Sequence, residues 1–445
     1  MQKPLLLLMA PVNTVSGYGA RSRDIAQALI ASDKYDVKIW PTRWGNTPQN
    51  HLNLQDEKDK QILDRCLDNP QLGQQPDIFI QITVPNEFQR IGKFNIGITA
   101  GIETTIAAAP WIEGCNNMDL ILTSSEHSKK VLLESIWDKH DQQTKQSVGV
   151  LKVEKPVEVL FEGVDLTKYF KTNDIHVSVD EQLKQVKEDF SFLFVGHWLK
   201  GDFGQDRKDI SGLIKTFLET FKNHPTATRP ALIIKTSSAD FSPLDREDLL
   251  NKIEHIILTV NGGIGSLSNI YVIHGDLTDG EINSLYNHPK VKAHVTFTKG
   301  EGFGRPLAEA SLSEKVMIAP NWSGQVDFLK HTIQVPGQLT PVHPSAAWEN
   351  VILQEASWFT ADYNQASEAL KFAFDKKNAK TIAVLAKRQA SVIKREFTME
   401  LMSDKLLEYV DGGASQIPKH VQLTLPKLKK IELPKLKKTE HEHTK

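Results

Sequence analysis

The chain has 445 residues, in which 53 lysines and arginines face 55 aspartates and glutamates, for a formal net charge of −2. A chain dominated by nucleic-acid binding carries a clear basic excess, and a disordered chain combines low hydrophobicity with a large net charge, so this balance excludes both classes. The hydrophobic share of 40% and the charged share of 24% are typical of globular proteins. The length suits about two or three domains.

Cysteine is rare in this sequence. The two cysteines, Cys66 and Cys115, have no metal-ligand spacing and cannot form a disulfide framework, so we expect a reduced, cytoplasmic protein. The first apolar run, residues 5–9, is far shorter than the roughly 20 residues needed to span a membrane. It therefore predicts a buried strand, and no transmembrane segment is expected.

Short apolar runs alternate with helical patterns along most of the chain. The first set of predicted strands covers residues 5–9, 37–40, 78–82, 96–99, 120–123 and 157–160, and the second covers 192–195, 231–234, 270–273, 294–297 and 316–319. Alternation of strand and helix predicts parallel sheets with helices on both faces. The fold class predicted is therefore α/β, with two doubly wound, Rossmann-like domains.

A polar, charged stretch separates the two sets of strands. We expect an N-terminal domain at 1–170, a linker at 171–190 and a C-terminal domain at 191–395. Residues 396–412 read as a helix that either closes the second domain or crosses back to the first. Residues 413–445 read as a basic, disordered tail.

The tail contains a repeat. The hexapeptide Leu-Pro-Lys-Leu-Lys-Lys occurs at 425–430 and again at 433–438, and from residue 417 onward eight lysines face three glutamates. Proline at this spacing forbids a continuous helix. The tail is interpreted as a solubilising segment, with an anionic partner, either nucleic acid or a membrane surface, as the alternative that would make the protein peripheral to one of these.

Two glycine-rich loops follow predicted strands. In the first, Gly17 and Gly19 precede a helix, where the backbone can approach an anion closely. Ser22 stands where a dinucleotide fingerprint needs a third glycine or an alanine, and the next strand offers no acidic residue for a ribose, so NAD binding is weakly supported.

The second loop, residues 300–309, carries more chemistry. The amides of Gly302, Phe303 and Gly304 are expected to face a bound anion. Glu301 on the loop and Glu309 one turn into the following helix can face one crevice. Two carboxylates beside an amide nest suit a sugar nucleotide, because carboxylates accept hydroxyl hydrogens and amides hold phosphates.

A third loop, residues 206–209, places two acidic residues around Arg207 and Lys208 at a helix start. Adjacent cations there oppose the helix dipole unless an anion compensates them, and a diphosphate would do so. The alternative is a solvated charged loop.

Together these segments resemble the retaining glycosyltransferases of family 4, which have the GT-B fold, so the resemblance implies two Rossmann-like domains facing a cleft. The central motif of the resemblance is a pair of glutamates, Glu301 and Glu309, with seven residues between them. The other matching segments are the Arg207–Lys208 pair, the Gly17–Gly19 loop, residues 101–104, 111–119 and 124–128, and Ser323 with Gly324. The resemblance covers roughly residues 5–410.

The resemblance implies a function for each motif. It implies Glu301, Arg207 and Lys208 as catalytic residues, with Glu301 near the donor sugar and both cations on the diphosphate. Glu309 would bind the ribose, and the acceptor would lie mostly in the N-terminal domain, beside Glu103 and Thr104. Attack on the front face would retain the anomeric configuration, the leaving phosphate helping to take the acceptor proton.

One departure from the family pattern concerns the donor phosphates. His197 stands where many members carry arginine, and Lys200 is a rival to Lys208 for the family's lysine. The positive charge at Arg207 and Lys208, with the loop amides, makes a divalent metal unnecessary, and the sequence contains no Asp-x-Asp metal clamp. We expect no metal and no cofactor, with a nucleotide-diphosphate sugar as substrate.

The acceptor stays open at this stage. A hydroxyl of a glycan, lipid or protein fits, and so does a modified base in DNA, for which the basic tail is the argument. A sugar-nucleotide epimerase and a non-catalytic nucleotide-sugar-binding protein are the alternatives with the same architecture.

Overall fold

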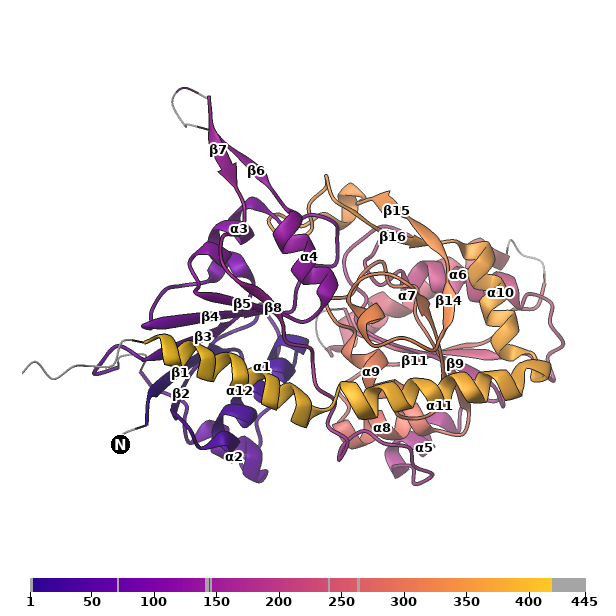
Figure 1. Ribbon diagram of the computed structural model, residues 1–445. Coiled ribbons are helices and arrows are strands. Elements are labelled where there is room, and N and C mark those ends of the chain that lie inside the picture. Colours follow the sequence, from indigo (N-terminus) through magenta and orange to yellow (C-terminus); the bar gives the residue numbers. More distant parts are fainter. Residues whose placement is uncertain are drawn as a thin grey trace, which may run out of the picture.

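The computed structural model describes residues 3–69, 72–140, 144, 146–238, 241–261 and 265–417. Over these ranges the chain forms two α/β domains that lie side by side, each built on its own six-stranded parallel sheet (Figure 1). The prediction of two doubly wound domains is confirmed. The repeated hexapeptides of the basic tail lie outside the described residues.

The N-terminal sheet has the strand order β2-β1-β3-β4-β5-β8. Its strands are β1 (Leu5–Ala10), β2 (Asp36–Pro41), β3 (Ile78–Ile82), β4 (Phe94–Thr99), β5 (Leu120–Thr123) and β8 (Val157–Val159). Its helices are α1 (Gly17–Ser32), α2 (Glu57–Leu63), α3 (Ala109–Asn116) and α4 (Glu126–Glu134). An antiparallel hairpin of β6 (Trp137–His140) and β7 (Ser147–Leu151) projects from this domain (Figure 1).

The C-terminal sheet has the order β11-β10-β9-β12-β13-β14. Its strands are β9 (Ser191–Val195), β10 (Ala231–Lys235), β11 (Ile270–Ile273), β12 (Val291–Val295), β13 (Val316–Pro320) and β14 (Ile333–Val335). Its helices are α5 (Val177–Leu183), α6 (Ile210–Thr220), α7 (Pro243–Asn261), α8 (Asp279–Asn287), α9 (Arg305–Ser311), α10 (Tyr363–Phe374) and α11 (Ala379–Glu396). A second antiparallel hairpin pairs β15 (Gly337–Pro341) with β16 (Ser357–Ala361).

The apolar runs became strands because both faces of each sheet are covered. In β9, Phe192 and Phe194 enter one core cluster while Leu193, between them, enters the cluster on the opposite face. In β1, Leu6 and Leu8 alternate with Leu7 in the same way. A strand buried on both faces needs apolar side chains at every position, which is the pattern in the sequence.

Some elements differ from the expectation. The strand expected at 294–297 is β12, which ends at Val295, because the Thr298 N–H turns back to the Thr296 hydroxyl at 3.2 Å. The expected linker, 171–190, contains α5, whose Val179 and Leu183 are buried in the C-terminal core. Strand β14 and the two hairpins were not predicted: β14 has only three residues, β7 and β15 are largely exposed, and β16, although Trp358 and Phe359 are buried, has no continuous apolar run.

The last two helices connect the domains. Helix α11 lies along the C-terminal domain, and α12 (Met399–Gln416) lies along the N-terminal one, where Met402, Leu406 and Val410 join its core (Figure 1). At the crossing, the Val164 N–H donates to the Phe397 carbonyl at 2.9 Å. Helix α12 ends at Gln416, so it extends four residues into the segment that was expected to be the tail. No helix of the described chain is long and apolar enough to cross a membrane.

Two neighbouring glycines in α12 give a matched test of this docking. A Cβ at Gly413 would lie 2.3 Å from the Phe94 ring, whereas nothing lies within 4 Å of a Cβ at Gly412. We expect Gly413→Ala to destabilise the protein by about 1–3 kcal/mol through overpacking. Gly412→Ala should stabilise it by about 0.5–1 kcal/mol, because alanine is the better helix former. Urea unfolding of both variants measures this, and equal effects would contradict the packing of α12 described above.

Candidate active site

The C-terminal sheet has its topological switch point between β9 and β12, the two central strands. Open α/β sheets bind ligands in the crevice outside the carboxyl ends of the strands at such a point. The loop after β9 carries Arg207 and Lys208, and the loop after β12 carries Glu301. The fold therefore brings two loops that are nearly a hundred residues apart in the chain to one crevice.

An ion cluster forms where the loops meet. The Lys208 Nζ lies 2.5 Å from Glu301 Oε1, and the Arg207 Nη1 lies 3.3 Å from Glu301 Oε2. Arg207 Nη1 also donates to the Gly300 carbonyl at 2.8 Å. Burial alone would raise the pKa of Glu301, but the two cations outweigh it and lower that pKa, so the carboxylate is ionised.

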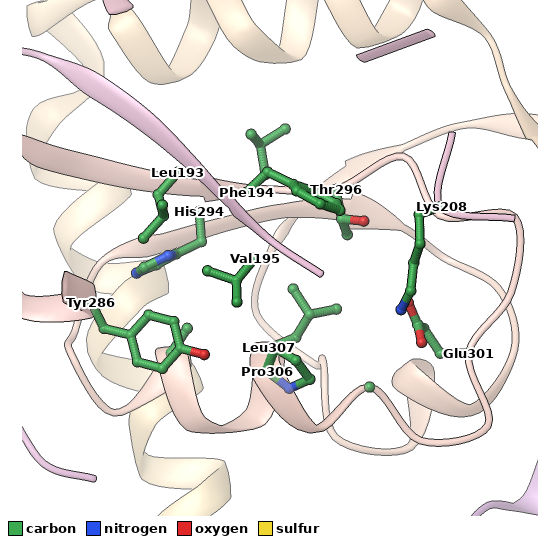
Figure 2. A pocket seen from close by; sticks show the side chains of 13 residues that line it. Leu193, Phe194, Val195, Lys208, Tyr286, His294, Thr296, Glu301, Pro306 and Leu307 are labelled. Atoms are coloured by element: carbon green, nitrogen blue, oxygen red, sulfur yellow. The ribbon is translucent and has the colours of Figure 1, made fainter. Parts of the chain in front are cut away.

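Figure 2 shows Lys208 and Glu301 facing each other at one side of a small cavity. The cavity has a volume of about 20 Å³ and lies between β9, β12 and the start of α9, where Val195, Pro306 and Leu307 line it. That space suits about one water molecule, whereas ligand pockets usually measure about 300–1,000 Å³. A nucleotide-sized ligand therefore requires this crevice to widen.

The backbone of Glu301 is held from behind. Its N–H donates to the Ser323 hydroxyl at 2.9 Å, and the Gly324 N–H donates to its carbonyl at 2.9 Å. A Cβ at Gly324 would lie 1.9 Å from the Gly302 carbonyl oxygen, so only glycine allows this contact. The Ser323–Gly324 pair, identified in the sequence, thus fixes the position of the carboxylate.

The N-terminal domain completes the cluster through Glu103, in the loop after β4. Glu103 Oε1 lies 3.4 Å from Arg207 Nη1, so Arg207 contacts carboxylates of both domains. Glycines in the other loop make the approach possible, because a Cβ at Gly300 would lie 2.1 Å from the Glu103 carbonyl oxygen. A Cβ at Gly302 would likewise lie 2.0 Å from the Ala100 carbonyl oxygen.

Thr104, predicted on the acceptor side with Glu103, does not reach the cluster. Its side chain is buried, and its hydroxyl donates to the Ile106 carbonyl at 3.2 Å. The Thr104 hydroxyl therefore makes its hydrogen bond within the loop after β4.

Glu309 lies on the first turns of α9, away from Lys208. Its Oε1 accepts from Arg305 Nε at 2.8 Å, and its Oε2 accepts from the Tyr286 hydroxyl at 3.4 Å. Burial raises the pKa of Glu309 to about 7, although the Arg305 guanidinium opposes this. Glu301 and Glu309 face different partners, so the two carboxylates do not share one proton or one cation.

Arg305 also crosses the domain boundary, where its Nη1 lies 2.5 Å from Asp24 Oδ2 on α1. Glu162 is buried beside this contact, and burial raises its pKa even though Arg21 and Arg305 lower it. Sequence reasoning missed these residues and Tyr286. Arg305 had a signal, because it lies four residues before Glu309 on a helix, where an ion pair forms readily. Asp24 had none.

The first glycine loop is occupied by local contacts. The Gly19 N–H donates to the Ser16 hydroxyl at 2.9 Å, which caps α1, and a Cβ at Gly19 would lie 2.1 Å from the Thr14 carbonyl oxygen. Gly19 is thus explained by capping and close packing, and its amide is not free for an anion in this arrangement. Nothing lies within 4 Å of a Cβ at Gly17.

The other two predicted residues of the second glycine-rich loop, Phe303 and Gly304, are explained by core packing and by backbone conformation. The Phe303 ring is buried, with its centroid 4.9 Å from that of Phe328, so the side chain belongs to the core. Gly304 has a φ of +102° at the start of α9, a conformation that favours glycine. Only backbone atoms of Phe303 and Gly304 are therefore left to contact a nucleotide-sugar.

The two lysines that the sequence offers for the phosphate site lie in different surroundings. Lys208, rather than Lys200, reaches Glu301, and Lys200 is exposed. His197 is exposed, with its Nδ1 3.0 Å from the Ser237 hydroxyl, and an imidazole with an ordinary pKa of about 6.5 does not supply the permanent charge of an arginine. Within the described ranges, no group of three or more His, Cys, Asp or Glu side chains is placed to hold a metal ion.

Comparison with known proteins rests on structure. No protein-family profile matches the chain, and no curated protein sequence matches it. A glycosyltransferase from Rickettsia africae superposes with a TM-score of 0.62 at 13% identity, covering 94% of this chain and 100% of the other. The sucrose-phosphate synthase of Thermosynechococcus elongatus gives 0.59 at 11%, covering 92% and 99%.

Two further similar structures were solved with ligands. The E. coli trehalose-6-phosphate protein bound with UDP-2-fluoro glucose gives a TM-score of 0.58 at 12% identity, covering 94% of this chain and 100% of that one. Anabaena HepE, in complex with UDP and glucose, gives 0.55 at 11%, covering 92% and 100%. These likenesses extend over both domains and nearly the whole of each chain. The chain therefore has the GT-B fold, the two-domain fold of these glycosyltransferases.

Proposed function

We propose that the protein is a retaining glycosyltransferase that moves a sugar from a nucleoside-diphosphate sugar to a hydroxyl group. The observation that carries this proposal is the cluster of Lys208, Arg207 and Glu301 at the switch point of the C-terminal sheet, facing Glu103 of the other domain. Two nearly buried cations at the place where α/β sheets bind ligands are suited to a diphosphate.

The chemistry follows from the charges that develop. Breaking the anomeric C–O bond leaves negative charge on the diphosphate, which Arg207 and Lys208 stabilise. Each charge-assisted hydrogen bond contributes about 1.5–3 kcal/mol, and about 1.4 kcal/mol corresponds to a tenfold change in rate. Two such cations account for a factor on the order of a thousand, and in this proposal they do the work that a divalent metal does elsewhere.

The carboxylates have separate functions in this proposal. Glu301, ionised between the two cations, accepts hydrogen bonds from the donor sugar. Glu309 accepts from the ribose hydroxyls after exchanging Tyr286 or Arg305 for them. Glu103 enters from the acceptor side, and its ion pair with Arg207 places the acceptor domain beside the leaving phosphate.

The ligands of similar structures suggest the first donor to test. Two proteins of this fold were solved with UDP or a UDP-sugar. UDP-glucose, GDP-glucose and ADP-glucose should be mixed with the protein and a panel of hydroxyl acceptors. Acceptor-dependent release of nucleoside diphosphate, with the α-anomeric configuration kept in the product, is the expected result. If no donor raises the melting temperature and none is consumed, the proposal is wrong.

Two lysines test the phosphate site directly. Lys208→Ala should weaken UDP binding by about 10- to 100-fold, because it removes a charge-assisted hydrogen bond to the phosphates. Lys200→Ala is the matched control, since Lys200 is an exposed lysine of the same loop without a partner in the cluster. Isothermal titration of both variants measures the difference. A loss confined to Lys200→Ala would move the phosphate site to the rival position.

The pKa of Glu309 gives a pH test. Because that pKa is about 7, the side chain is a carboxylate at pH 8 and largely protonated at pH 6. An ionised carboxylate binds hydroxyls more strongly, so UDP-glucose affinity should fall by about fivefold from pH 8 to pH 6. UDP-glucose has no phosphate group that titrates in this range. Glu309→Gln should bind weakly and lose the pH dependence, and an unchanged profile in that variant would remove Glu309 from the donor site.

A further inference from the structure

The tetrapeptide Asp206-Arg207-Lys208-Asp209 divides its charges between two environments. Arg207 and Lys208 face the cleft, whereas both aspartates are fully buried in the C-terminal domain. Asp206 Oδ2 accepts from the Ile210 N–H at 3.4 Å, within the turn that starts α6. The aspartates therefore anchor a loop whose cations form the candidate phosphate site.

Asp209 has an ionic partner that the proposed reaction does not use. Lys299 is 1% exposed, and its Nζ lies 3.7 Å from Asp209 Oδ2 and 3.1 Å from the Thr360 hydroxyl. The Tyr363 hydroxyl donates to the same Asp209 oxygen at 2.7 Å. A lysine is almost never buried this completely without a compensating charge, and Asp209 supplies that charge here.

The backbone of Lys299 contacts the same loop. Its N–H donates to the Arg207 carbonyl at 2.7 Å, and its own carbonyl accepts from the Phe359 N–H at 3.0 Å. Lys299 lies two residues before Glu301 in the chain. It therefore ties the loop that carries the cations to the loop that carries the carboxylate, once through its side chain and once through its backbone.

Asp209 occupies a strained position that needs such support. Its φ is +50°, in the left-handed region that costs a residue other than glycine about 1–3 kcal/mol. Its carboxylate is also packed tightly, because a Cβ at Gly212 would lie 2.3 Å from Asp209 Oδ1. Strain of this kind persists where surrounding contacts determine the conformation, and it is concentrated at functional sites.

Stability alone does not explain the pair. Replacing a buried ion pair by neutral groups of similar volume is often neutral or stabilising, because desolvation offsets the attraction. We propose that Lys299 is a positioning residue, which fixes Arg207 and Lys208 at the phosphate site by holding Asp209 in its left-handed turn. The proposal rests on the proposed function, since it assigns the phosphate site to those two cations.

The test removes both charges together, because Lys299→Met alone would leave Asp209 buried and unpaired. The double variant Lys299→Met/Asp209→Asn keeps the volumes similar and the Tyr363 bond available. Its affinities for UDP and for UMP are measured by titration, and its melting temperature by calorimetry. We expect UDP binding to weaken by at least tenfold while UMP binding changes less than threefold, because the cations act on the diphosphate.

A second variant keeps the proposal testable if the double variant does not fold. Tyr363→Phe removes only the hydroxyl bond to Asp209 and retains Lys299, so it should weaken UDP binding by about threefold with the UMP affinity unchanged. The effect of each variant should also shrink to less than twofold in an Arg207→Ala/Lys208→Ala background, since residues that act through one another are not additive.

The outcomes separate this inference from the proposed function. If the wild type binds UDP and both variants bind it equally well, Lys299 has no positioning effect and the inference is overturned. The same conclusion follows if UDP and UMP weaken in parallel with a loss of melting temperature, because that result describes a purely structural role. If the wild type binds none of UDP, GDP and ADP, the proposed function itself fails.

Discussion

The ion cluster of Lys208, Arg207 and Glu301 is the constraint on which the rest of the site depends. Each of these side chains is at most 15% exposed, and an unpaired charge at such depth is strongly unfavourable. The protein supplies the compensating charge itself, from Glu301 in one domain and Glu103 in the other. In the proposed function a bound diphosphate takes over part of that compensation, which would link its binding to the arrangement of the carboxylates.

The same principle operates at the second glutamate. Glu309 is paired with Arg305, and Arg305 is paired with Asp24 of the other domain, so the carboxylate proposed to bind the ribose is linked to the domain boundary. The cavity between β9, β12 and α9 holds only about 20 Å³. The cavity is lined by the C-terminal domain alone, whereas the ion pairs of Arg207 with Glu103 and of Arg305 with Asp24 join the two domains beside it.

The glycines of the second loop illustrate how one residue type can serve two purposes. From the sequence, Gly302 was predicted to expose an amide to an anion. In the structure, Gly300 and Gly302 allow the loops of two domains to touch, because Ala100 and Glu103 occupy the space of a Cβ. Absence of a side chain is needed in either case, so the sequence pattern alone does not separate the two reasons.

The sequence by itself determined the fold class and most of the strands, because a strand buried on both faces is apolar at every position and the period is local. It also placed Glu301, Arg207 and Lys208 as candidates, since charges beside glycine-rich helix starts are a local signal. Only the tertiary structure placed Lys208, and not Lys200, beside Glu301 and brought Glu103 to Arg207. It also buried Lys299 against Asp209 and coupled Arg305 to Asp24. These contacts join residues far apart in the chain, and their energies depend on burial and domain packing, which no local pattern encodes.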